Sequence, residues 1–273
     1  MSEKAIGKLR QSQFMRDLKK NSYILSVMVK RNFKAQYRNS VLGVFWTVLN
    51  PLLNMIVMSF VFSKLFGSDN SIGNYPVYIF CGNLIFNIMR QVTTQSLGCL
   101  VSNSDLIKKV KISYSIFPMS NMFTALVNFG VAFIALIIVM LIVGQQFHWT
   151  LLLTILILPA VLIFSLGVGY ALSSMFVFFR DVSHLYEVFM TLWMYLTPLF
   201  YSASSLGEDG TLVRNVIEFN PMTHYVSAFR SIVQWGQVPS GIEFLICYAW
   251  AIGALIVGYT IFKLNRKKYI LYI

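Results

Sequence analysis

Residues 116–143 read IFPMSNMFTALVNFGVAFIALIIVMLIV, and residues 151–179 read LLLTILILPAVLIFSLGVGYALSSMFVFF. Neither stretch contains a charged side chain, and each is longer than the roughly 20 apolar residues that cross a bilayer core as a helix. In lipid the backbone must satisfy its own hydrogen bonds, so both stretches should be helical. Only the short segment GQQFHWT separates them, which predicts a transmembrane helical hairpin.

Four further apolar runs extend this pattern, near residues 41–66, 78–101, 185–201 and 244–264. The six runs are numbered in chain order, so residues 116–143 and 151–179 are the third and fourth. Of the 273 residues, 57% are hydrophobic and only 12% are charged, a balance that would expose too much apolar surface on a soluble domain. We therefore predict an all-α integral membrane protein with six transmembrane helices, forming a single transmembrane domain over residues 1–273.

Positive charge is distributed unevenly between the connections. The chain has 22 Lys and Arg against 10 Asp and Glu. If the runs alternate in direction, most cations lie on one side, and the exceptions are Lys64, Arg90, Arg214 and Arg230. The positive-inside rule then places both termini in the cytoplasm. Such basic patches suit anionic lipid headgroups or phosphates rather than nucleic acid.

This orientation divides the chain into three parts. Residues 1–40 form a basic cytoplasmic or interfacial segment, residues 41–264 the six-helix membrane domain, and residues 265–273 a cytoplasmic tail. Residues 21–38, NSYILSVMVKRNFKAQYR, mix apolar and basic side chains. They are too charged to span a membrane, so an amphipathic interfacial helix fits better than the alternative, a solvated basic arm.

The connection between the second and third runs, residues 102–113, carries the signals of a short helix. Ser104 is a candidate N-cap, and Asp105 falls in the first turn, where an acidic side chain is favourable. A short basic helix exposed between two spans suits a docking element. The alternative is an ordinary solvated loop.

One polar stripe follows the second run. Its members recur at i, i+4 or lie beside that row: Asn83, Asn87, Arg90, Gln91, Thr94 and Gln95. Polar side chains in membrane helices face a bundle interior, a partner helix or water rather than lipid. Two interpretations stay open, helix–helix packing and the lining of a conduit.

The fifth run is rich in aromatic residues and ends in TPLFYS. Aromatic belts at the membrane interface account for some of them. Phe189 and Trp193 lie deeper, at i, i+4 on one face. Because aromatic faces also stack on sugar rings, a polysaccharide path is the second interpretation.

The longest connection on the predicted outer side, residues 202–241, contains a further helix. Asn220 and Pro221 suit the N-cap and first helical positions. Apolar residues then follow helical spacing, but a helix over Pro221–Gln234 is too short to span. We expect a re-entrant or interfacial helix, with TLVRNVIEF before it as its partner half.

The sequence contains no motif for several kinds of chemistry. No GxxxxGK[ST] phosphate loop occurs, and the three cysteines and three histidines fit no metal-ligand spacing. Few acidic residues fall inside the runs, which disfavours an ion- or proton-coupled carrier, and no catalytic cluster supports a membrane glycosyltransferase. We expect a protein that is not an enzyme and binds no cofactor itself.

A series of short motifs is distributed along the chain. They are YRNSVLGVFW at 37–46, Asn50-Pro51-Leu52, Phe179-Arg180-Asp181, TPLFY at 197–201, Asn220-Pro221-Met222 and Phe229-Arg230. In order and spacing they resemble the membrane permease subunits of ABC-type exporters of cell-surface polysaccharides (O-antigen, capsule and teichoic acid). The likeness extends over nearly the whole chain, although many relatives have Ser in place of Thr197.

The resemblance implies a homodimer with two copies of a separate cytoplasmic ATPase, which would hold ATP and Mg. It implies a bacterial cytoplasmic (inner) membrane protein. The ATPase would dock on residues 21–38 and 102–113, including Ser104, Asp105, Lys108 and Lys109. The family's conduit is lined by the first and fifth helices, which here indicates Phe45, Trp46, Phe189, Trp193 and Tyr195, with Phe200 and Tyr201 nearer the outer mouth.

The resulting hypothesis is ATP-driven export of a glycan attached to a polyprenyl diphosphate lipid. Arg31, Lys34 and Arg38 are the candidates for the diphosphate, since Arg offers a bidentate fork to phosphate. Their alternative role is ordinary positive-inside anchoring. The rival functions are a drug or lipid exporter of the same architecture, an ion-coupled secondary carrier and, least favoured, a glycosyltransferase.

Overall fold

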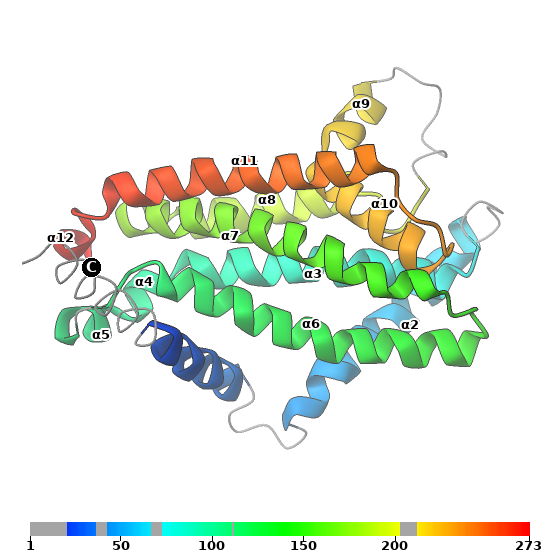
Figure 1. Cartoon of the computed structure of the whole chain (residues 1–273), viewed down its shortest axis with the longest axis horizontal. Coiled ribbons are helices and arrows are strands. Elements are labelled where there is room, and N and C mark those ends of the chain that lie inside the picture. The colour runs from blue at the N-terminus through cyan, green and yellow to red at the C-terminus, as the bar shows by residue number, and fades with distance from the viewer. Residues whose placement is uncertain (1–20, 37–42, 67–72, 111, 203–211) are drawn as a thin grey trace, which may run out of the picture.

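The computed structural model describes residues 21–36, 43–66, 73–110, 112–202 and 212–273, and the regular structure in these ranges is helical. The elements in chain order are a helix at 21–36, η1 (Gly43–Phe45), α2 (Trp46–Phe66), α3 (Tyr75–Leu97), α4 (Cys99–Ser102), α5 (Ser104–Lys109), α6 (Ile116–Val143), η2 (Trp149–Leu153), α7 (Thr154–Phe178), α8 (Val182–Leu196), α9 (Leu212–Phe219), α10 (Pro221–Val233), α11 (Gly241–Asn265) and α12 (Tyr269–Tyr272). Figure 1 shows the long helices α3, α6, α7 and α11 aligned along one axis, with α2 crossing beside α6.

Within the described ranges, three segments are long and apolar enough to cross a membrane: Ile116–Val143, Trp149–Phe178 and Gly241–Asn265. The predicted hairpin is confirmed, because α6 has the bounds of the third apolar run. It ends at Gly144, whose φ of +73° lies in the left-handed region that glycine adopts without steric cost. The chain then returns through η2 into α7.

The fifth apolar run is not one continuous helix, and the prediction that every run is helical throughout is wrong here. α8 ends at Leu196, and an irregular segment follows. Pro198 explains the break, because a proline disfavours helical backbone at the preceding residue and lacks an N–H donor. The segment from Thr197 to Phe200 is buried.

α7 and α11 lie side by side at backbone contact distance. A Cβ atom on Gly258 would lie 1.8 Å from the carbonyl oxygen of Gly167, and one on Gly167 would lie 2.4 Å from the carbonyl carbon of Ala254. Ala254 and Gly258 are four residues apart, on one face of α11. Small residues at this spacing permit two membrane helices to approach closely.

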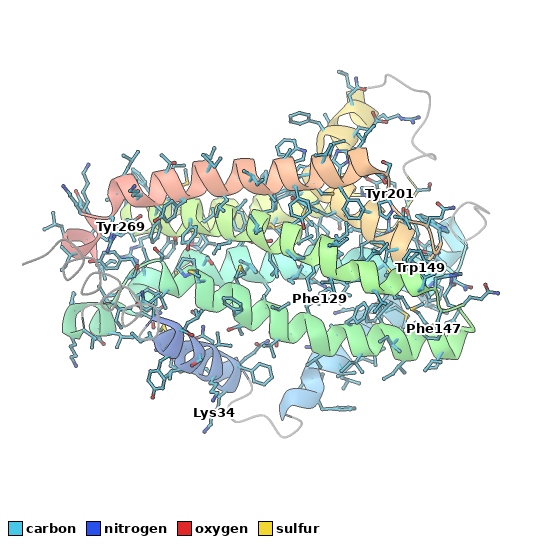
Figure 2. All side chains as sticks on the ribbon, viewed as in Figure 1. Lys34, Phe129, Phe147, Trp149, Tyr201 and Tyr269 are labelled. Carbon is cyan, nitrogen blue, oxygen red and sulfur yellow. The ribbon has the colours of Figure 1, made fainter. Side chains whose placement is uncertain are left out.

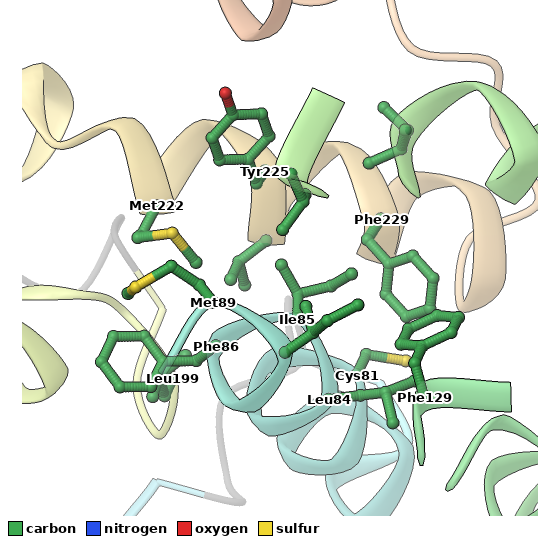
Figure 3. Close-up of a cluster of buried hydrophobic side chains, with 14 of the residues drawn as sticks. Cys81, Leu84, Ile85, Phe86, Met89, Phe129, Leu199, Met222, Tyr225 and Phe229 are labelled. Carbon is green, nitrogen blue, oxygen red and sulfur yellow. The ribbon is translucent and has the colours of Figure 1, made fainter. Parts of the chain in front are cut away.

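The main apolar core surrounds α3 and α10. Figure 3 shows Ile85 and Met89 of α3 beside Met222 and Tyr225 of α10, and all four side chains are buried. The Tyr225 hydroxyl donates a hydrogen bond of 2.8 Å to the carbonyl oxygen of Cys247, which joins α10 to α11. The predicted helix after Asn220 is confirmed, and at 13 residues it is embedded in this core.

A second core lies at the end of the molecule that holds α4, α5 and α12, which we term the α5 end (Figure 1). Met28 of the first helix is buried there with Leu100, Phe117 and Tyr269. Burial raises the pKa of Tyr269 to about 12, so its hydroxyl stays protonated and donates to the carbonyl oxygen of Phe262. The described part of the predicted amphipathic helix, residues 21–36, therefore packs Ile24, Leu25 and Met28 against the bundle.

At the opposite end, termed the α10 end, amide side chains connect the start of α3, the loop after α6 and the end of α10. Asn74 donates to the Gln145 side chain, whose own amide donates 2.8 Å to the carbonyl oxygen of Gln234. Thr150 donates 2.7 Å to the carbonyl oxygen of Ile232. Successive long helices thus run in opposite directions, since α3 and α7 begin at this end and α6 finishes here.

Candidate functional site

A cavity of about 600 Å³ lies between α2, α3 and α6. Its wall includes the whole polar stripe of α3, together with Asn50 and Asn54 of α2 and Asn128 of α6. Trp46, Phe86, Phe129 and Phe200 contribute aromatic surface. The cavity therefore combines neutral amides with aromatic rings, and Arg90 is the only charged side chain among the described residues that line it.

Within the described part of the chain, the polar side chains of the stripe do not join helices through hydrogen bonds. Among the residues that the structure describes, the side chains of Asn83, Asn87, Gln91 and Gln95 form no hydrogen bond, and neither do those of Asn50 and Asn54. These amides are exposed or partly exposed where they line the cavity, so they are open to water or to a polar ligand. Of the two sequence interpretations, the geometry favours the lining of a conduit.

The amides of α2 and α6 were missed by sequence reasoning, although a signal was present. Asn50 and Asn54 are spaced i, i+4, as in the α3 stripe, and Asn121 and Asn128 are spaced i, i+7. Asn128 donates 3.0 Å to the Gln36 side chain, and Asn121 donates 2.9 Å to the carbonyl oxygen of Gln95. These bonds connect α6 to the first helix and to α3.

At the α10 end, the segment after α8 is held by its carbonyl groups. The Arg230 guanidinium donates to the carbonyl oxygens of Pro198 at 2.6 Å and Leu199 at 2.8 Å. The hydroxyls of Tyr75 and Tyr78 donate to the next two, those of Phe200 and Tyr201, at 2.7 and 2.8 Å. Four successive carbonyls of an irregular segment are thus satisfied by α3 and α10, as the bilayer requires.

Arg230 was counted as a loop cation from the sequence, yet only 3% of its surface is exposed. It also donates 3.2 Å to the Tyr78 carbonyl oxygen, and its central carbon lies 3.4 Å from the Tyr78 ring centroid. The absence of a side chain at Gly82 makes room, because a Cβ there would lie 2.6 Å from the guanidinium. The signal was its place four residues after Val226, on the apolar face of α10.

The aromatic residues predicted to line a conduit do not all meet at the cavity. Of these residues, Trp46 and Phe200 belong to its wall, whereas Phe45, Phe189 and Tyr195 are exposed on the outside of η1 and α8. Trp193 is half-buried, and its indole N–H donates 2.7 Å to the Asn220 side chain. Tyr201 donates 2.9 Å to the carbonyl oxygen of Tyr195.

The predicted docking residues lie together at the α5 end. Arg31 of the first helix donates 2.6 Å to the Asn103 side chain, and Lys108 donates 3.0 Å to the Ile273 carbonyl oxygen. Asp105 and Lys109 are exposed. α5 begins at Ser104, so Asn103 occupies the N-cap position, and the prediction that Ser104 caps the helix was wrong by one residue.

The phosphate candidates are only partly described. Arg31 is engaged with Asn103, while Lys34 is exposed on the first helix, at the surface in Figure 2. Arg38 lies outside the described residues. Among the described residues, no group of three or more His, Cys, Asp or Glu side chains is arranged to hold a metal ion.

Residues 23–233 match the family model of the ABC-2 type transporter. The chain is 27% identical over 257 residues to the O-antigen export system permease protein RfbA of Myxococcus xanthus, covering 94% of this chain and 98% of the relative. It is 26% identical to RfbA of Klebsiella pneumoniae, with 90% and 92% covered, and 18% identical to the polysialic acid transport protein KpsM of Escherichia coli, with 87% and 91% covered.

The chain belongs to the ABC-2 type transporter family. It is a multi-pass membrane permease, the membrane component of its transporter rather than an enzyme, and such a component works with a partner ATPase subunit. The resemblance seen in the sequence motifs is thereby confirmed.

Proposed function

We propose that this chain is the membrane subunit of an ATP-driven exporter that moves a polyprenyl-diphosphate-linked polysaccharide across the bacterial cytoplasmic membrane. The family assignment and the functions of the relatives support the export of a polysaccharide. The O-antigen type has the strongest support among glycans, because the RfbA relatives are the more similar.

The observation that carries the proposal is the set of unpaired amides in the cavity. Each Asn or Gln side chain offers both donors and an acceptor, which matches the hydroxyl groups of a sugar. From Asn83 to Gln95 the stripe extends over about 18 Å at 1.5 Å per residue. A track of neutral amides binds successive sugars in similar ways, so no single position holds a moving polymer strongly.

The membrane arrangement follows from the helices and the charge. α2 and α3 have 21 and 23 residues, enough to span, and α8 would complete its crossing through the held segment after Leu196. With α6, α7 and α11 this makes six spans in one domain over residues 1–273. The cations of α5 and of the α11–α12 turn gather at the α5 end, which supports a cytoplasmic α5 end and both termini inside.

In this arrangement α9 and α10 form an outer re-entrant pair, and the functional unit is a homodimer. The exposed aromatic residues of α8, Phe189 and Tyr195, and the exposed face of α2 would meet a second copy. A conduit on the two-fold axis would then place these aromatic rings opposite the amide cavity. Two ATPase subunits, which hold ATP and Mg, would complete the transporter.

The amide cavity gives the first test of export. Asn87→Leu removes an exposed, unpaired amide from the middle of the α3 stripe. We expect surface display of the glycan to fall at least about tenfold, since an apolar group interrupts the polar track. The measurement is glycan display in cells that lack the native permease gene and carry the variant.

Gln146→Leu is the matched control, because Gln146 is an exposed amide in the loop after α6, outside the cavity wall. Its display should equal that of the wild type at equal protein abundance. Full display by Asn87→Leu would contradict the role of the cavity. Display that depends on an ion gradient without the ATPase would support a secondary carrier instead.

The docking surface gives the second test. We propose that the ATPase contacts the first helix and α5, including Ser104, Asp105, Lys108 and Lys109. Lys109→Glu reverses an exposed charge on α5, which should reduce the amount of co-purified ATPase severalfold, more so at low salt. Lys267→Glu, an exposed charge in the turn between α11 and α12, is the control. Equal co-purification of the two variants would count against docking on α5.

A further inference from the structure

We infer that Arg90 is the binding site for an anionic group of the cargo, a phosphoryl or carboxylate oxyanion that enters the amide cavity. This inference rests on the proposed function, and it assigns to the cavity a charge specificity that amides alone do not provide. The observations that carry it are the unpaired state of the guanidinium, its place in the cavity wall and the absence of a carboxylate beside it among the described residues.

The two arginines of the bundle differ in what their donors bind. Arg230 directs its guanidinium to carbonyl oxygens of its own chain and to the Tyr78 ring. Arg90 lines the cavity and is exposed, and none of the described residues accepts a hydrogen bond from it. An ionised side chain at membrane depth is costly, so an unpaired one that faces a cavity indicates a ligand.

The surroundings of Arg90 leave its positive charge uncompensated. The described residues of the cavity wall include no Asp or Glu. Among the described residues no carboxylate forms a salt bridge with Arg90, and the described ion pair, Arg214 with Glu218, is on α9. The neighbouring Gln91 and Thr94 supply neutral donors without opposing charge. Arg90 therefore presents a positive potential inside a low-dielectric wall, which attracts anions and repels cations.

The position of Arg90 along α3 fits a group that arrives from the α5 end. It lies seven residues before Leu97, which is about 10 Å from the end of the helix. Gln95 and Thr94 lie between it and that end, so a headgroup would meet a neutral amide and a hydroxyl first and the guanidinium next. The planar guanidinium offers a bidentate fork that suits phosphoryl and carboxylate oxygens alike.

Two sources of the oxyanion are separable by experiment: the diphosphate of a lipid carrier and an acidic sugar within the glycan. The permease–ATPase complex in nanodiscs is titrated with farnesyl diphosphate and with an oligogalacturonate. Farnesol and a neutral maltooligosaccharide are the uncharged counterparts. The variants are Arg90→Gln and Arg90→Lys, with Arg214→Gln, an arginine on α9 outside the cavity, as the control.

We expect Arg90→Gln to weaken binding of one anionic probe roughly 10- to 100-fold, the range of a lost charge-assisted hydrogen bond. Arg90→Lys should weaken it less, and the uncharged probes should bind as before. Loss confined to farnesyl diphosphate identifies the lipid headgroup, and loss confined to the oligogalacturonate identifies an acidic sugar.

Three results would overturn the inference: unchanged binding of both anions to Arg90→Gln, equal weakening of the uncharged probes, or no saturable binding of either anion to the wild type. Glycan display reports separately on the proposed function. If display still depends on Asn87 while anion binding does not depend on Arg90, the function stands and the assignment of Arg90 fails.

Discussion

Replacing Gly258 by alanine should destabilise the bundle by about 1–3 kcal/mol, and replacing it by leucine should prevent stable folding. The added Cβ would lie 1.8 Å from the carbonyl oxygen of Gly167, which is backbone and cannot move aside as a side chain could. α7 and α11 would have to separate along their closest contact. The measurement is the melting temperature of the detergent-solubilised protein, followed by fluorescence-detected size-exclusion chromatography.

Gly253 provides the matched control on the same helix. A Cβ at Gly253 would meet nothing within 4 Å, so Gly253→Ala should leave the melting temperature unchanged or raise it slightly, because alanine favours helix more than glycine. Equal melting temperatures for the two alanine variants would show that the close approach of α7 and α11 is not required.

Replacing Arg230 by methionine should have the second large effect, a loss of about 2–6 kcal/mol of stability. Methionine keeps the apolar stem but removes the donors to the carbonyls of Pro198 and Leu199, and each buried acceptor left unpaired costs about 1–3 kcal/mol. Phe200, which follows them, belongs to the cavity wall. Glycan display should therefore fall together with the melting temperature.

Two variants make this expectation specific to the guanidinium. Arg230→Lys keeps the charge but not the fork, so it should recover only part of the stability. Arg214→Met breaks the exposed i, i+4 ion pair with Glu218 at 2.9 Å, a kind of pair worth about 0.3–0.5 kcal/mol. A melting temperature of Arg230→Met as high as that of Arg214→Met would contradict the proposed role of the carbonyl contacts.

The sequence predicted those features that depend on local periodicity and capping. The bounds of α6 follow from an uncharged run that ends in glycine, and the start of α10 follows from Asn220 and Pro221. Both signals are local in the sequence. They suffice because the backbone of an apolar segment in lipid has no competing structure to adopt. The asymmetry of the cations is likewise a property of the chain order.

The sequence did not separate side chains that face the cavity from those that pack inside the bundle. Trp46 and Trp193 both looked like conduit residues, yet the first belongs to the cavity wall and the second is bound to Asn220. The break in the fifth run was also missed, because the run was assigned as one helix from its apolar composition and Pro198 was not taken into account. Pro198 is itself a local signal for that break, whereas only the tertiary contacts separate the two tryptophans.

Arg90 and Arg230 show most clearly what each level of structure determined. From the sequence alone, Arg90 was predicted to lie within an apolar helix and Arg230 in a connection between two apolar runs. Only the tertiary structure shows that the Arg230 guanidinium donates hydrogen bonds to the carbonyl oxygens of Pro198 and Leu199, whereas Arg90 lines a cavity. The reason is physical: periodicity assigns a residue to a helix face, but only the neighbouring elements determine whether that face meets carbonyl groups or open space.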